Sequence, residues 1–177
     1  ATDTISLERF TRTATRIESE LLVKAQGARM VFSADIGPGV TVDRLENRFW
    51  TASDDLTAAP RQEAVLTFKG DSVIAEVGRG SQMRTQRLPS KAGALPHLNP
   101  SFALLELGLA RARANKLQEV TFFAVSGGQT FTMRIQPLGA DSLLLVIAGG
   151  ETRVRIDAQG RIVGGVIPSQ NLFVDRV

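Results

Sequence analysis

The sequence has no cysteine and no tyrosine, and only one histidine and one tryptophan among its 177 residues. Without cysteine the chain can form neither a disulfide framework nor a thiolate metal site. The single histidine, His97, cannot assemble a typical zinc site, and it is the one candidate base for a serine triad. We therefore expect no catalytic residue, no metal and no cofactor.

Long hydrophobic runs are also absent. The longest, Phe102–Ala110 and the stretch that starts at Ser142, fall short of the roughly 20 apolar residues that cross a bilayer. Composition and length suit one globular domain over residues 1–177, with 43% hydrophobic and 22% charged residues. The net charge is +3, but the arginines are scattered among acids and aromatic residues are only 6% of the chain. This pattern does not favour nucleic-acid binding, which needs clustered cations.

The second half of the sequence alternates between short apolar runs and turn signals. In the run Thr130–Gln136, Phe131, Met133 and Ile135 fall on one face and polar residues on the other. Glycine-containing turns recur roughly every ten residues, a spacing typical of hairpins: Gly127–Gly128, Gly139–Asp141, Gly149–Gly150 and Gln159–Gly160. The pattern predicts an antiparallel meander with one buried and one solvated face.

The first half is less regular but is also predicted to be β-rich. Three strands are expected between Glu18 and Trp50, with turns at Gln26–Gly27 and Gly37–Gly39. A further hairpin has its tip at Lys69–Asp71 and is expected to end at Gly78–Gly80. The glycines at this end resemble the start of a dinucleotide-binding motif, but the third glycine of that motif is missing. Two segments have loop composition: Thr51–Gln62, and Arg87–Pro100, which we expect to be an irregular crossing.

One helix is expected near residues 100–115. Asn99 is the predicted N-cap, followed by Pro100 in the first helical position. From Phe102 to Ala110 only Glu106 and Gly108 interrupt the apolar run, so the helix should be buried on most sides. A single helix among hairpins achieves this only across or inside a curved sheet. The predicted fold is mainly β, a curved antiparallel half-barrel or β-clam of about ten strands closed by this helix.

The order of elements and the crossing "LPHLNPSFALLELGLARA" resemble the β-clam of the periplasmic lipoprotein carriers LolA and LolB. The closing stretch "IDAQGRIVGGVIPSQNLFVDRV" is similar to β-rich periplasmic domains of the DUF3108 kind. The resemblance implies a periplasmic protein with a lipid-sized cavity between sheet and helix. The opening "ATDT" also suits a start exposed by signal-peptide cleavage, so we expect export to a periplasm.

Two functions from different classes remain open. The first is a non-enzymatic exported domain that binds a lipid or other apolar ligand. The residues expected to line its cavity are apolar and large: Trp50, Phe68, Phe102, Leu105, Leu109, Phe122 and Phe131. The second is an accessory subunit that docks on a larger, membrane-associated complex through its arginine-bearing strand faces or an uncovered edge strand. An enzyme that uses His97 as a base ranks third.

Overall fold

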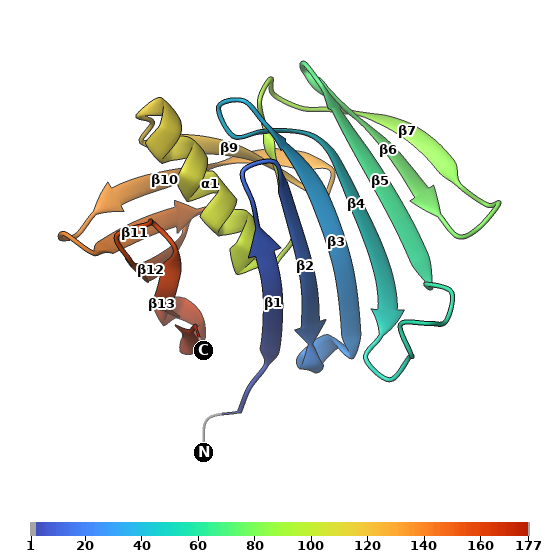
Figure 1. Cartoon of the computed structure of the whole chain (residues 1–177), viewed down its shortest axis with the longest axis horizontal. Helices are drawn as coiled ribbons and strands as arrows, with labels where there is room; N and C mark the ends of the chain where they lie inside the picture. The colour runs from blue at the N-terminus through green and yellow to red at the C-terminus, as the bar shows by residue number, and fades with distance from the viewer. Residues whose placement is uncertain (1–2, 177) are drawn as a thin grey trace.

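The computed structural model describes residues 3–176 and shows two seven-stranded sheets with one long helix between them (Figure 1). The first sheet has its strands in chain order: β1 (Ser6–Arg12), β2 (Arg16–Val23), β3 (Ala28–Gly37), β4 (Thr41–Thr51), β5 (Gln62–Lys69), β6 (Ser72–Gly78) and β7 (Arg84–Pro89). The second sheet also has its strands in chain order: β8 (Leu95–His97), β9 (Glu119–Ala124), β10 (Gln129–Pro137), β11 (Ser142–Ile147), β12 (Gly150–Ile156), β13 (Ile162–Ile167) and β14 (Leu172–Asp175). All neighbouring strands are antiparallel except β8 and β9, because the helix α1 (Phe102–Asn115) connects these two.

The alternation seen in the sequence sets which face of each strand is buried. In β12, Thr152 and Val154 are buried and the flanking arginines, Arg153 and Arg155, are exposed. The predicted mainly β fold with one helix and a curved, one-sided sheet is therefore confirmed. The expected turns are also present, and at Gly27 the left-handed backbone (φ +56°) ends the short 3-10 helix Lys24–Gln26.

The strand inventory differs from the expectation in two places. The chain forms fourteen strands rather than about ten, and the expected irregular crossing Arg87–Pro100 contains the end of β7 and the whole of β8. Both strands lie at sheet edges, where proline is tolerated because one side of the strand needs no hydrogen-bonded neighbour. Pro89 ends β7, and Pro96 is the central residue of β8.

The helix begins two residues later than expected. Its N-cap is Ser101, not Asn99: the Ser101 hydroxyl accepts a hydrogen bond from the backbone N–H of Leu104 at 3.2 Å. Pro100 therefore precedes the cap and lies outside the helix. At the other end, Lys116 adopts a left-handed conformation and closes the helix.

The core lies on both sides of α1. Seven of its buried residues are apolar or glycine, and they pack between the concave side of the first sheet and the inner face of the second (Figure 1). The approach is closest at Gly108, where an added Cβ would lie 2.5 Å from the Cζ of Phe122. Phe122, Met133 and Leu145 have no exposed surface. The space beneath the middle of the helix is thus filled by side chains.

Candidate functional site

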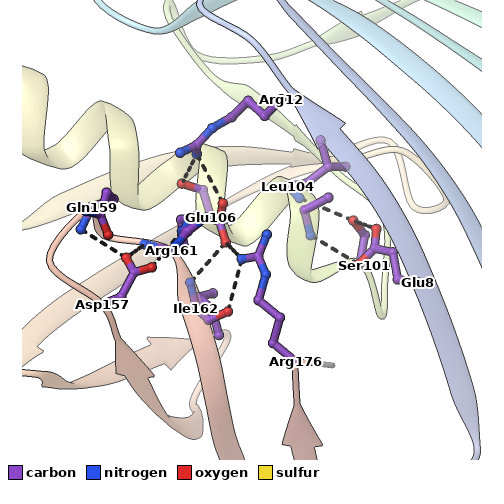
Figure 2. Close-up of polar contacts among 11 residues, drawn as sticks. Glu8, Arg12, Ser101, Leu104, Glu106, Asp157, Gln159, Arg161, Ile162 and Arg176 are labelled. Atoms are coloured by element: carbon purple, nitrogen blue, oxygen red, sulfur yellow. Dashed lines mark hydrogen bonds and ion pairs between the residues drawn. The ribbon is translucent and has the colours of Figure 1, made fainter.

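The first turn of α1 is held by a carboxylate from the edge strand β1. Glu8 accepts hydrogen bonds from the backbone N–H groups of Phe102 (2.7 Å) and Ala103 (3.1 Å), and from the hydroxyls of Ser101 (2.7 Å) and Ser19 (2.8 Å). Figure 2 shows this carboxylate against Ser101. Because N–H groups at a helix start have no partners within the helix, a negative charge there is stabilised. The anion-binding capacity of this helix start is therefore already satisfied by Glu8.

One turn further along, Glu106 forms the centre of a buried charge cluster (Figure 2). Its side chain is 2% exposed and accepts hydrogen bonds from the backbone N–H of Ile162 and the guanidinium of Arg176, both at 2.9 Å. Arg12 lies 3.6 Å from the other carboxylate oxygen and donates to the Glu106 backbone carbonyl at 3.2 Å. The Arg176 guanidinium also lies over the ring of Phe10. This cluster joins β1, α1 and the end of the second sheet, and its role is structural.

A pocket of about 360 Å³ opens beside the first turns of the helix. Its apolar walls are Phe102 and Leu105 from α1 and Phe131 and Ile147 from the second sheet. The polar side chains that line it come from the segment before the helix, the strand ends and the 3-10 turn Pro168–Gln170: His97, Asn99, Ser101, Ser126, Gln129, Glu151, Thr152, Ser169 and Gln170. We call this space the His97 pocket.

His97 is wedged between two aromatic rings in this pocket. Its imidazole packs against the rings of Phe122 and Phe131 in T-shaped contacts, with centroid distances of 5.7 and 5.0 Å. Burial lowers the pKa of His97 to about 4, because an apolar surrounding disfavours the charged ring. At neutral pH the side chain is an uncharged imidazole with one donor and one acceptor nitrogen. It makes no side-chain hydrogen bond within residues 3–176.

Among the other polar groups of the His97 pocket, Ser101 is bonded to Glu8 and to the Leu104 N–H, whereas most of the rest lie at the solvent-exposed rim. Gln129, Thr152 and Gln170 make no side-chain hydrogen bond to any described residue, although Thr152 is buried. The lining includes no lysine and no arginine, and its one carboxylate, that of Glu151, is solvent-exposed. The pocket therefore offers uncharged hydrogen-bonding groups around an apolar interior, which is the usual composition of a small-molecule site.

The structure brings together only part of the predicted cavity lining. Phe102, Leu105 and Phe131 line the His97 pocket. Leu109 and Phe122 are buried in the core instead, with Phe122 stacked on Phe131 at a centroid distance of 5.7 Å.

The two remaining predicted lining residues lie elsewhere. Phe68 packs edge-on against Phe123, on the side of the second sheet that faces away from the pocket. Trp50 lies on the outer face of the first sheet, in register with Arg29, whereas its neighbour Phe49 faces inward. The indole N–H of Trp50 donates to the carbonyl of Ala58 at 2.9 Å, so the loop after β4 covers it.

The residues that sequence reasoning missed are Glu8 and Glu106. A lone carboxylate inside an apolar helix was a usable signal for Glu106, because an unpaired buried charge is too costly to persist. Glu8 carried no comparable signal, since its role depends on where β1 lies in space. Within residues 3–176 no group of three potential metal ligands comes together, and no helix is long and apolar enough to cross a membrane. His97 and Ser126 line the same pocket without a hydrogen bond between them.

No protein-family profile and no curated protein sequence matches this chain. Among solved structures, its fold is similar to that of a DUF1089 family protein from Pseudomonas aeruginosa, with a TM-score of 0.63 and 14% sequence identity. The similarity covers 99% of this chain and 94% of the other. It supports the predicted β-rich fold, whereas no link to LolA, LolB or DUF3108 domains is shown. At this identity the likeness is one of fold alone: the chain shares the architecture of a DUF1089 family protein.

Proposed function

We propose that this protein is a non-catalytic binding domain that takes a small apolar ligand in the His97 pocket. The observation that carries the proposal is the pocket itself, in which apolar walls from α1 and the second sheet meet a half-buried histidine and a rim of polar side chains. An apolar concavity with a few hydrogen-bonding groups is the usual form of a small-molecule site.

The size of the pocket limits the ligand. A volume of about 360 Å³ is near the lower end of ligand pockets in general, which run from about 300 to 1,000 Å³. The pocket cannot extend along the helix, because Phe122 meets Gly108 there and fills the space. We therefore propose a single short alkyl chain or an aromatic molecule of up to about three rings. A lipoprotein-carrier role of the kind implied by the resemblance to LolA and LolB would require the acyl chain of the lipoprotein to bind in this small pocket.

The state of His97 supports a binding role over a catalytic one. A general base works best when its pKa lies near the operating pH, and burial lowers the pKa of His97 to about 4. A catalytic histidine is also oriented by a hydrogen bond to a carboxylate or carbonyl. The ring of His97 is held instead by the two aromatic contacts with Phe122 and Phe131.

The proposal is tested by titrating the protein with N-phenyl-1-naphthylamine, an uncharged probe whose fluorescence rises in apolar surroundings. We expect saturable binding at one site per chain. Ala124 lines the pocket, so Ala124→Leu should fill part of it and weaken probe binding at least about tenfold. Thr132→Leu, which adds similar bulk on the opposite face of the same sheet, is the matched control and should bind as the wild type does. Equal binding by wild type and Ala124→Leu, or no saturable binding, would exclude the proposal.

A second candidate, the accessory subunit, is favoured by one surface. β1 and β14 are edge strands with a protein neighbour on one side only, and together they line a groove of about 140 Å³ beside Phe102. Leu7 on β1 is 54% exposed and Phe173 on β14 is 69% exposed. Edge strands with exposed apolar side chains accept an extended segment of another chain as an added strand. Arg9 on β1 makes no ion pair within residues 3–176, and an acidic residue in that segment would complement it.

The two candidate functions predict that binding is lost in different variants. Co-purification of a partner from cells that express the protein should be abolished by Phe173→Asp and unaffected by Ala124→Leu if β14 is the docking edge. Retention of the same partner by Phe173→Asp would exclude docking there. Export to a periplasm remains a prediction of the sequence, and cell fractionation of the expressed full-length protein tests it.

A further inference from the structure

We infer that the ligand of the His97 pocket is an uncharged molecule whose polar group is a hydroxyl or an amide that hydrogen-bonds to His97. This inference rests on the proposed function and specifies the chemistry of its ligand. Three observations support it: the near absence of charged side chains in the pocket lining, the hydrogen bonds that already satisfy the N–H groups at the helix start, and the fixed, uncharged ring of His97.

A negatively charged ligand finds no counterion in this pocket. None of the eighteen lining residues is a lysine or an arginine, and the one charged residue, Glu151, has the same sign as an anion. The start of α1 would ordinarily attract a carboxylate or phosphate. Here the N–H groups of Phe102 and Ala103 already donate to Glu8, and that of Leu104 donates to Ser101. An anion would therefore lose its hydration without gaining charge-assisted hydrogen bonds, which is strongly unfavourable.

A positively charged ligand is disfavoured for a related reason. The carboxylate of Glu151 lies at the exposed rim, where solvent weakens its attraction for a cation inside the pocket. The one titratable side chain in the interior, His97, is uncharged at neutral pH. The interior therefore matches an uncharged ligand.

The ring of His97 is both held in place and free to bond. Contacts with Phe122 and Phe131 define its position, so little rotational freedom remains to be lost on binding. The fully buried side-chain polar atoms that lack a partner among the described residues are Arg29 Nε and Asn47 Oδ1. The ring nitrogens of His97 are not among them, and His97 makes no side-chain hydrogen bond, so these nitrogens stay accessible. A hydroxyl or a primary amide can donate to one nitrogen or accept from the other.

The test compares four ligands with the same eight-carbon chain at pH 7: 1-octanol, octanamide, octanoate and octylammonium. Each is used to displace N-phenyl-1-naphthylamine from the wild-type protein. We expect the two uncharged ligands to compete at least about tenfold better than either charged one. Octanoate or octylammonium competing as well as 1-octanol would overturn the inference and leave the proposed function standing. Failure of the fluorescent probe itself to bind would instead remove the proposed function.

Variants at two polar positions identify the bonding partner. His97→Phe keeps the aromatic packing but removes both nitrogens, and it should weaken 1-octanol about fivefold to tenfold while the fluorescent probe still binds. Gln136→Leu removes a glutamine side chain from the same strand outside the pocket and is the matched control, with 1-octanol affinity unchanged. Unchanged 1-octanol affinity in His97→Phe, or an equal loss in Gln136→Leu, would overturn the assignment to His97.

Discussion

Acidification from pH 7 to pH 5 should destabilise this protein through the one histidine that it contains. His97 is partly buried against Phe122 and Phe131, and its pKa in the folded protein is about 4. In an unfolded chain the same side chain titrates near 6.5. Below pH 6.5 the unfolded state therefore binds a proton that the folded state does not accept, and this difference favours unfolding.

The size of the effect follows from the separation of these two pKa values. At pH 7 the imidazole is mostly neutral in both states, so the contribution of His97 to stability is fully present. Each pH unit below 6.5 costs about 1.4 kcal/mol until the folded state also becomes protonated near pH 4. The free energy of unfolding should thus fall by about 2 kcal/mol between pH 7 and pH 5, and by about 3 kcal/mol in all.

Urea unfolding at pH 7, 6 and 5, followed by the fluorescence of the single tryptophan, measures this change. His97→Phe is the control, because it preserves an aromatic ring between the two phenylalanines and has nothing to titrate in this range. The variant should be nearly insensitive to pH between 7 and 5. Because the chain has one histidine, its imidazole NMR signal also gives the folded-state pKa directly. A measured pKa above 6, or an equal slope in wild type and variant, would refute the reasoning.

Three substitutions test the packing around α1, all by urea unfolding. Glu106→Ala leaves two arginines without their buried partner and should cost about 3 kcal/mol; a loss below about 1 kcal/mol would show that the cluster contributes little. Gly108→Ala should cost about 1–2 kcal/mol despite the higher helix propensity of alanine. Gly139→Ala, with open space around it, is the control and should not destabilise the protein. A more stable Gly108→Ala variant would contradict the close contact with the second sheet. Glu8→Ala removes the cap from the helix start and should cost about 1–2 kcal/mol, while Glu18→Ala on the surface changes little; equal effects would show that the cap is unimportant.

The repeating parts of the fold were predictable because they depend on neighbours in sequence. Alternating apolar residues in Thr130–Gln136 and glycine turns such as Gly127–Gly128 are local signals, and both led to strands and hairpins that the structure contains. The apolar run from Phe102 likewise predicted a buried helix. The division into two sheets was only partly signalled: pairing ends between β7 and β8, inside the expected crossing Arg87–Pro100, but composition alone does not say that a second sheet begins there.

The candidate site was less predictable because it depends on side-chain direction and distant contacts. Three of the seven expected lining residues lie in the pocket, and Trp50 lies on the opposite face of its sheet because a shift of one residue reverses a side chain's direction. From the sequence, His97 was considered only as a candidate base in the crossing before the helix. Its state follows from Phe122 and Phe131, which are 25 and 34 residues away and pack around its ring.

The cluster at Glu106 also has a consequence for the order in which the chain can complete its fold. Its two arginine partners stand 94 residues earlier and 70 residues later in the sequence. During synthesis the carboxylate therefore emerges long before one of its counterions, and a helix docked on the first sheet alone would hold an incompletely matched buried charge. Such a half-finished state is disfavoured, and contacts this distant in sequence slow folding. Glu106 should thus delay the final docking of α1 until both sheets have formed.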